Sequence, residues 1–530
     1  MDHFFGIDVG TSSAKGVAID QAGRVVASAT HPYPISHPHP GWSEQNPEDW
    51  WAATVRVIAD LRTHLGVERG GAGGTNNIRA VGLSGQMHGS VFLDQATINA
   101  RGQHGTPLRP AILWNDQRTA SQCAEIEQLA GGRRALVQLV GNAALTGFTL
   151  PKILWLRRHE PAVFARVAQV LLPKDYVRFR LSGHCGTDVG DASGTLLLDV
   201  DRRTWSAKAI SNVELDPTWL PTIVESAAQS TTLSAWAADQ TRLPVGTPIV
   251  GGSGDNQCGA VGAGVVAPGM VLATLGTSGV IYAHADQPRK DLPPPHLISN
   301  KDDNDIGRLH TMCAATGDAR TPGGWCVTGV MLSAAGSLQW ARDTLFLQES
   351  FDTLLSEAQR APPGCEGLIF LPYLTGERCP HADPEARGGW IGLTARHTRA
   401  HLIRAIVEGV TFGMRQILDL VRSTGVPVDQ VRLGGGGARS PLWRQLQADV
   451  YDLPVATTNT DQGPALGAAL MAGVGAGAWP SVPAACAATI REVEVVGPSE
   501  HSGQYSASRQ AFERLYEALR ETNGMLARIE

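Results

Sequence analysis

The residues that could do chemistry first appear in the stretch 4–18, where a Gly-Thr-Ser turn joins two apolar runs. The turn carries the hydroxyls of Thr11 and Ser12 together with backbone N–H groups, and such a concave set of donors suits a phosphate. A carboxylate would repel a phosphate, so Asp8, just before the turn, indicates a metal ion between the two. Taken alone, the stretch fits a surface hairpin of small residues equally well.

The stretch 270–283 repeats the same pattern far along the chain, with Gly276 and Thr277 in its turn. A repeated strand–turn–strand pattern indicates two similar structural units, each with a phosphate-binding turn. The repeat makes the surface-hairpin alternative less favourable for both stretches.

A third candidate follows the short apolar strand expected at 248–252, where the chain reads Ser253-Gly-Asp-Asn256. A carboxylate at the end of a buried strand, here Asp255, is a candidate general base. The competing interpretation is a turn aspartate that bonds its own backbone, which is the more common role on composition alone.

Two further segments have polar residues directly after apolar runs. Met87 and His88 follow the strand expected at 78–83, a position where open α/β sheets place ligand-binding groups. We expect His88 to hydrogen-bond hydroxyls and Met87 to pack on the carbon face of a small molecule, although a lone histidine is more often structural. In the segment 434–440, four consecutive glycines let a ring lie on the backbone at Gly436 and Gly437, and Ser440 begins a helix that can face a phosphate.

The elements that position these residues belong to an ordinary globular protein of 530 residues, with 43% hydrophobic and 18% charged residues. This length favours two to four domains. The net charge of -6 argues against nucleic acid or an anionic membrane as the main partner. The chain has no apolar run of ~20 residues, no N-terminal secretory pattern and no Cys-x-x-Cys spacing among its eight cysteines. We therefore expect a cytoplasmic protein with reduced thiols.

Together these segments resemble the FGGY family of carbohydrate kinases, from Phe5 to beyond Ala469. The matching blocks, in the order of the family, are Asp8-Val-Gly-Thr-Ser12, Gly41-Trp-Ser-Glu-Gln-Asn-Pro47, Gly85-Gln-Met-His-Gly89, Leu113-Trp-Asn-Asp116, Gly254-Asp-Asn256, Leu275-Gly-Thr-Ser-Gly279, Gly435-Gly-Gly-Ala-Arg-Ser440 and Gly463-Pro-Ala-Leu-Gly467. Within the family, the 85–89 and 113–116 blocks are similar to members that phosphorylate D-xylulose. The segments 69–77, 95–106 and 316–328 look atypical, and the last could alter oligomer contacts or access to the cleft.

The resemblance implies an α/β fold of two ribonuclease-H-like domains, of the actin and sugar-kinase type, that close around ATP and sugar. We place the domains at 1–246 and 247–530. The implied reaction is ATP-dependent, Mg²⁺-assisted phosphorylation of D-xylulose at its 5-hydroxyl, a step from xylose catabolism into the pentose phosphate pathway. The implied roles are Asp255 as proton acceptor, Asp8 as the Mg²⁺ residue acting through water, Met87, His88, Asp255 and Asn256 for the sugar, and Thr11, Ser12, Gly276, Thr277, Gly436, Gly437 and Ser440 for the nucleotide.

Two alternatives stay open. A kinase for another ketose or a polyol, such as ribulose, would share every ATP motif. A non-catalytic ATP-binding chaperone or filament protein of the same fold would leave the Gln-Met-His tip without a role. The oligomeric state also stays open, with a homodimer as one candidate.

Overall fold

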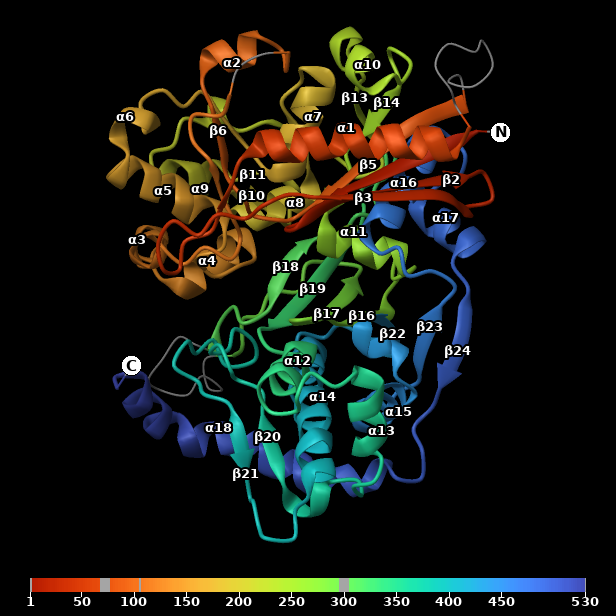
Figure 1. Cartoon of the computed structure of the whole chain (residues 1–530). Coiled ribbons are helices and arrows are strands. Elements are labelled where there is room, and N and C mark those ends of the chain that lie inside the picture. The colour runs from red at the N-terminus through yellow and green to blue at the C-terminus, as the bar shows by residue number, and fades with distance from the viewer. Residues whose placement is uncertain (1, 67–76, 104–105, 295–304, 530) are drawn as a thin grey trace.

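The computed structural model describes residues 2–66, 77–103, 106–294 and 305–529, which form two domains, one above the other in Figure 1. Each domain is built on a seven-stranded sheet. The glycine-rich segment expected as a loop at 69–77 lies outside the described residues, except for its last residue.

The first sheet has the order β13-β14-β5-β1-β2-β3, and β15 also pairs with β5. Its strands are β1 (His3–Val9), β2 (Ser13–Asp20), β3 (Val25–Pro32), β5 (Ile78–Gly85), β13 (Gln229–Thr232), β14 (Pro248–Val250) and β15 (Ser253–Gly254). The strands of the β1–β2 hairpin are antiparallel, while β5 runs parallel to β1.

The second sheet has the order β18-β19-β17-β16-β22-β23-β24. Its strands are β16 (Gly269–Leu275), β17 (Gly279–Ala285), β18 (His310–Cys313), β19 (Trp325–Met331), β22 (Val428–Gly435), β23 (Val455–Thr458) and β24 (Glu492–Val496). Here β16 and β17 form the antiparallel hairpin and β22 runs parallel to β16.

The two sheets repeat one another in detail, as the repeated Gly-Thr-Ser turns predicted. In each, the first strand has a register irregularity after its first residue, between His3 and Phe4 in β1 and between Gly269 and Met270 in β16. Asp8 is opposite Ser84 in the first sheet, and the corresponding Thr274 is opposite Gly434 in the second. The chain therefore uses one strand arrangement twice, with different side chains at the strand ends.

The predicted boundary between residues 246 and 247 falls too early, because β14 and β15 still pair with β5 of the first sheet. The second sheet begins only at β16. The apolar residues between prolines and glycines at 243–252 are typical of a link between domains. In the structure this part of the chain instead adds strands to the first sheet.

Helix α1 (Pro47–His64) covers one face of the first sheet, and its start follows the sequence signals. Asn46 is the N-cap, its side chain accepts a hydrogen bond from the Glu48 N–H, and Pro47 opens the helix. The remaining helices before the second sheet are α2 (Gln95–Asn99), α3 (Ala120–Ala130), α4 (Arg133–Val140), α5 (Thr149–His159), α6 (Pro161–Phe164), α7 (Pro173–Ser182), α8 (Val189–Ala192), α9 (Ala207–Asn212), α10 (Ala235–Thr241) and α11 (Asp255–Gly262). Short strand pairs connect them: β4 (Glu44–Gln45) with β7 (Ala111–Ile112), β6 (Val91–Leu93) with β8 (Gln169–Leu171), β9 (Gly186–Asp188) with β12 (Thr222–Val224), and β10 (Leu198–Asp199) with β11 (Thr204–Trp205).

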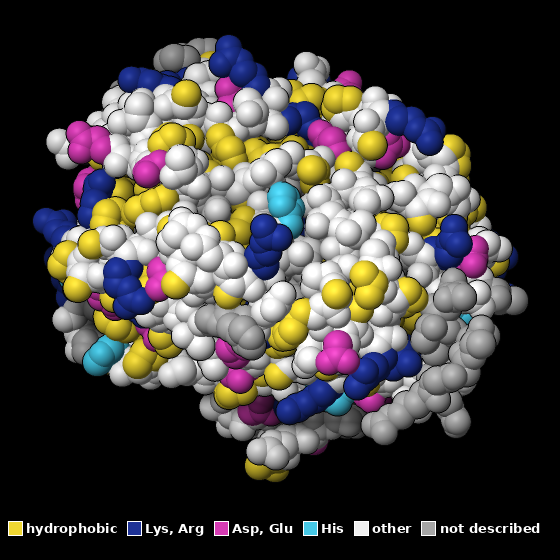
Figure 2. Space-filling model, turned by 90° about the horizontal axis from the view of Figure 1, so that it is seen from above, with side chains coloured by type: hydrophobic (Ala, Val, Ile, Leu, Met, Phe, Trp, Pro, Cys, Tyr) yellow, Lys and Arg dark blue, Asp and Glu magenta, His cyan; other side chains and the backbone are white. Residues whose placement is uncertain are grey.

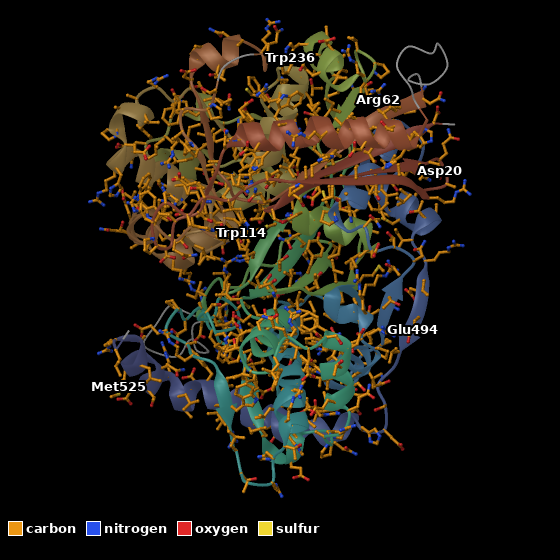
Figure 3. All side chains as sticks on the ribbon, in the orientation of Figure 1. Asp20, Arg62, Trp114, Trp236, Glu494 and Met525 are labelled. Carbon is orange, nitrogen blue, oxygen red and sulfur yellow. The ribbon has the colours of Figure 1, made fainter. Side chains whose placement is uncertain are left out.

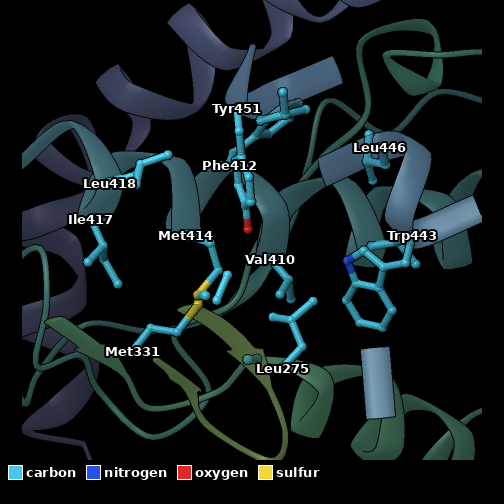
Figure 4. Packing of buried hydrophobic residues seen from close by; sticks show 14 of the residues in the cluster. Leu275, Met331, Val410, Phe412, Met414, Ile417, Leu418, Trp443, Leu446 and Tyr451 are labelled. Atoms are coloured by element: carbon cyan, nitrogen blue, oxygen red, sulfur yellow. The ribbon is translucent and has the colours of Figure 1, made fainter. Parts of the chain in front are cut away.

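The second domain is organised around α14 (Arg399–Ser423), whose buried apolar residues recur at helical spacing. Figure 4 shows Val410, Met414 and Ile417 of α14 packed with Met331 and Leu275. The other elements in this part of the chain are α12 (Ala335–Thr344), α13 (Phe351–Ala358), β20 (Ile369–Leu371), β21 (Gly389–Ile391), α15 (Pro441–Tyr451), α16 (Pro464–Gly475), α17 (Val482–Thr489) and the closing helix α18 (Ser506–Ala527).

Helix α16 returns from the second domain to pack on β1 and β5 of the first sheet, and α11 crosses it closely. A Cβ at Gly467 would lie 1.9 Å from the Cys258 carbonyl oxygen, and one at Gly262 2.2 Å from the Gly463 carbonyl oxygen. Only glycine permits this approach. The helix pair between the domains is thus a tightly packed junction.

The face of the molecule in Figure 2 carries basic and acidic side chains interspersed, without a large patch of either sign. All eight cysteines are free thiols. Within the described ranges, no helix of the protein is long and apolar enough to span a bilayer.

Candidate functional site

Two carboxylates predicted from separate motifs, Asp8 and Asp255, lie beside each other because three strand ends of the first sheet are in register. Asp8 of β1 is opposite Ser84 of β5, and Ser253 of β15 is opposite Ser84 on the other side. Asp255 follows two residues later as the first residue of α11. The Ser84 hydroxyl donates a hydrogen bond of 2.9 Å to Asp8 Oδ1.

The electrostatic environment makes both groups weaker acids. Removal from water raises the pKa of Asp8 to about 6, although the Ser84 hydrogen bond and the charge of Lys15 oppose the rise. Removal from water and, second, the Asp8 charge raise the pKa of Asp255 to about 7. A carboxylate whose pKa is near neutrality can accept a proton effectively at physiological pH.

The first turn is held by side chains from three distant segments. Gln45 Nε2 donates to the Thr11 carbonyl oxygen at 2.7 Å, and Gln86 Nε2 donates to the Gly10 carbonyl oxygen at 3.3 Å. The Trp114 indole N–H donates to Thr11 Oγ1 at 3.0 Å. Figure 3 shows Trp114 on the side of the first domain that faces the second. From the sequence, Trp114 belongs to a block similar to sugar-specific members of the family, and no local pattern indicates its hydrogen bond to the first turn.

The second turn lies against the glycine segment. The Thr277 carbonyl oxygen accepts hydrogen bonds from Ala334 N–H and Gly336 N–H at 2.9 and 3.2 Å. Gly435 has φ +75° and approaches the Leu275 carbonyl oxygen so closely that a Cβ would lie 2.4 Å from it. The turn and the glycine segment are therefore one packed unit.

Two cavities meet at this unit. The cleft cavity, of about 650 Å³, lies between α11 and the second sheet and reaches from Asp255 and Asn256 to Gly436. The lateral cavity, of about 670 Å³, is lined by the second turn, the glycine segment, α12 and α13. Gly436 and Arg439 line both cavities. A ligand that crosses Gly436 can therefore occupy both.

The predicted nucleotide residues are distributed unevenly over these walls. Gly276, Thr277, Gly436 and Ser440 line the lateral cavity. The Ser440 hydroxyl also caps α15 by accepting a hydrogen bond from the Trp443 N–H. Gly437 lines neither cavity: it is buried, and a Cβ there would lie 2.7 Å from the Leu275 Cβ. Its closeness to Leu275 shows that it packs the strand ends together.

The predicted sugar residues come together around Asp255. Asn256 Nδ2 lies 3.7 Å from Met87 Sδ, and a Cβ on Gly254 would collide with Met87. His88 Nδ1 lies 2.9 Å from the Gly194 carbonyl oxygen and donates to it, which leaves Nε2 as an acceptor. Burial lowers the pKa of His88 well below its usual value, so the ring is neutral.

Helix α5 and the residue before it hold the His88 backbone and ring in place, a contact that the sequence did not predict. Lys152 Nζ and Thr149 Oγ1 donate to the His88 carbonyl oxygen at 2.8 and 3.1 Å. The Phe148 ring lies edge-on to the His88 ring, with centroids 4.5 Å apart. Phe148, Thr149 and Lys152 lie at the start of α5, and nothing in this local sequence indicates a contact with His88.

The donor set fits a magnesium ion at Asp8 only if other ligands arrive with the substrate. The part of the chain that the structure describes has no group of three or more His, Cys, Asp or Glu side chains able to hold a metal. Asp8 Oδ1 takes the Ser84 hydrogen bond, while Oδ2 has no hydrogen bond among the described residues. Mg²⁺ commonly binds one or two carboxylates together with water and substrate phosphates. Asp8 meets that requirement.

The sequence and the fold both match known proteins. Residues 3–262 match the model of the FGGY family of carbohydrate kinases, N-terminal domain, and residues 271–476 match its C-terminal domain. The xylulose kinase of Bacillus subtilis (strain 168) is 37% identical over 527 residues, 99% of each chain. A ligand-bound xylulose kinase from Lactobacillus acidophilus has a TM-score of 0.87, 25% identity and coverage of 99% and 100%. A gluconate kinase from the same organism also has a TM-score of 0.87, with 26% identity and coverage of 99% of each chain.

Proposed function

The chain belongs to the FGGY family of carbohydrate kinases, and on that premise we propose that it transfers the γ-phosphoryl group of ATP to the 5-hydroxyl of D-xylulose. The full-length similarity to a xylulose kinase supports this substrate over others in the family. The observation that carries the chemistry is the pair of carboxylates, Asp8 and Asp255, at the same end of one sheet, with Asp255 also lining the cleft cavity.

Asp255 is the proton acceptor in this proposal. The 5-hydroxyl oxygen attacks the γ-phosphorus, its proton passes to the Asp255 carboxylate, and the bond to the β-phosphate oxygen breaks to release ADP. In such a loose transition state, positioning and charge stabilisation supply most of the rate acceleration. A pKa of about 7 keeps a large fraction of Asp255 ionised at neutral pH.

The nucleotide would lie across Gly436, with its adenosine in the lateral cavity near Ser440 and its phosphates directed to the two turns. Thr11 and Ser12 would bind phosphate from the first domain, and Gly276 and Thr277 from the second. Gly437 would act indirectly, by holding the glycine segment on Leu275. Asp8 would hold Mg²⁺ through water, and the ion would neutralise phosphate charge as it is transferred.

The ketose would rest on Met87, with hydroxyl groups directed to His88 Nε2 and Asn256. Because His88 is neutral and donates through Nδ1, its free nitrogen can accept a hydrogen bond from a hydroxyl group. The eight free cysteines support our placing of the reaction in the cytoplasm.

The deciding experiment is ADP release from the purified full chain with ATP, Mg²⁺ and a panel of D-xylulose, D-ribulose, xylitol, glycerol and D-gluconate. We expect the highest kcat/KM with D-xylulose. A higher value for ribulose, a polyol or gluconate would transfer the assignment to that substrate. ADP release that no sugar stimulates would favour the chaperone or filament alternative.

A further inference from the structure

A polar loop after β20, residues 375–381, forms part of the second domain but has no role in the proposal above. It is anchored to the end of β19: Glu377 Oε1 accepts hydrogen bonds from the Leu332 and Arg378 N–H groups at 2.9 and 2.7 Å. The Thr375 hydroxyl lies 3.1 Å from the Ser333 hydroxyl. The loop is therefore fixed, and the side chain at its centre has a defined position.

That side chain, Arg378, is half-buried and has no hydrogen bond or ion pair with any described residue. The carboxylate of the preceding residue, Glu377, accepts hydrogen bonds from backbone amides and forms no ion pair with Arg378. Guanidinium groups carry five donors and are seldom left half-buried without acceptors. Arg378 thus has free donors that a bound molecule can satisfy.

The loop lies against the part of the second sheet nearest the sugar residues. The next residue, Cys379, packs on β19, where its Sγ would be 3.2 Å from a Cβ on Gly329. The residue before Gly329, Thr328, is opposite His310 of β18. Figure 1 shows β18 and β19 at the border between the two domains.

The Phe148 ring packs between His310 and His88, one of the predicted sugar residues. The Phe148 ring is 4.5 Å from the His88 ring on one side and 5.3 Å from the His310 ring on the other, between centroids. Arg378 is close enough to both histidines for its charge to contribute to lowering their pKa values, although burial is the larger cause for each. The packing of Cys379 on β19, the pairing of Thr328 with His310 and the contacts of the Phe148 ring together place the loop on the His88 side of the sugar residues.

We propose that Arg378 binds the sugar from the second domain, donating hydrogen bonds to oxygens at the end of the ketose away from the reacting hydroxyl. Asp255 and Asn256 receive the 5-hydroxyl end, so the guanidinium faces the C1–C2 end beyond His88. Since the other sugar residues belong to the first domain, this contact makes the sugar a bridge between the domains. The inference rests on the proposed function and names one more specificity-determining residue for it.

The test is steady-state kinetics of R378M, R378Q and R378K beside the parent. The control is R396M, which removes an arginine that is 63% exposed and pairs with Glu366 on the surface of the same domain. Losing hydrogen bonds from a charged donor should raise the KM for D-xylulose about ten- to a hundredfold in R378M and R378Q, with kcat and the KM for ATP within about threefold. The KM of R378K for D-xylulose should lie between the values of these two variants and that of the parent, and the KM of R396M should equal that of the parent.

A binding measurement accompanies the kinetics. With ADP present, D-xylulose should raise the melting temperature of the parent and R396M, and at the same concentration should leave that of R378M and R378Q unchanged. An unchanged KM for D-xylulose would overturn the proposal. So would a fall in kcat at constant KM, which places Arg378 on the phosphoryl group, or a rise confined to the KM for ATP. If the parent prefers another sugar of the panel, the proposed function fails while the same comparison with that sugar still tests Arg378.

Discussion

Asp255→Asn removes the proposed base while it keeps the size of the side chain and its ability to accept the backbone hydrogen bonds at the start of α11. We expect kcat to fall about 10²- to 10⁴-fold, the usual contribution of a general base. Binding of D-xylulose and of ADP, measured by calorimetry, should remain within about threefold of the parent because no cavity wall is removed.

The pH profile gives a sharper test of the same residue. With a pKa of about 7 for Asp255, the ionised fraction is roughly 0.1 at pH 6 and roughly 0.9 at pH 8, so kcat/KM should rise about tenfold between them. This acid limb should disappear in Asp255→Asn. In Asp8→Asn the residual activity should keep the limb but move it to lower pH, because the Asp8 charge is one of the causes that raise the pKa of Asp255.

The assay is a coupled measurement of ADP release, with kcat/KM for MgATP taken at saturating D-xylulose so that it reports on the enzyme before nucleotide binds. Asp255→Asn with near-parent kcat would remove Asp255 from the role of base. An acid limb that survives in Asp255→Asn, or that moves to higher pH in Asp8→Asn, would refute the electrostatic reasoning.

Three further expectations concern other parts of the structure. Trp114→Phe deletes the hydrogen bond to Thr11 Oγ1 and should raise the KM for ATP about fivefold, corresponding to about 1 kcal/mol, a change that initial-rate kinetics would detect and that an unaltered KM would contradict. Lys174→Met leaves the carboxylates around its fully buried ammonium group uncompensated and should lower the free energy of unfolding, measured with denaturant, by about 3–5 kcal/mol. The control, Lys290→Met, loses an ion pair with a half-exposed aspartate and should lower it by less than about 1 kcal/mol. Equal losses of unfolding free energy in the two variants would refute the distinction between buried and exposed pairs. The folded protein binds the Asp255 proton more tightly than the unfolded chain, so ionisation of Asp255 lowers the stability of the parent as the pH rises from about 4 to about 7. Asp255→Asn should therefore be more stable than the parent by about 1–3 kcal/mol at pH 8 and equal to it at pH 4. A stability gain of the same size at both pH values would argue against the raised pKa.

The sequence predicted those features that depend on local pattern. Apolar runs on both sides of the two Gly-Thr-Ser turns predicted both hairpins, and the structure has them. Asp8 and Asp255 could be singled out because each polar residue follows an apolar strand directly. The family resemblance then gave their order a meaning, and the family models and the full-length relative confirmed the family.

The sequence did not predict which distant segments meet. The Trp114–Thr11 and Ser84–Asp8 hydrogen bonds join residues far apart in the chain, and they depend on strand order and register. The domain boundary was placed too early for the same reason, since the pairing of β14 with β5 is a property of the sheet. A run of four glycines likewise could not reveal that Gly437 packs on Leu275 while Gly436 lines both cavities.

The two repeated sheets explain how the site can tolerate domain motion. Asp8 and Asp255 both belong to the first sheet, one on β1 and one after β15, and β5 between them fixes their separation. In the second sheet the positions that correspond to Asp8 and Ser84 are Thr274 and Gly434, so the carboxylate of Asp8 has no counterpart there. A rotation of one domain on the α11–α16 junction would therefore move the nucleotide-binding wall relative to the carboxylate pair without changing the distance between the carboxylates. The part of the rise in the Asp255 pKa that comes from the Asp8 charge is thus set within one sheet.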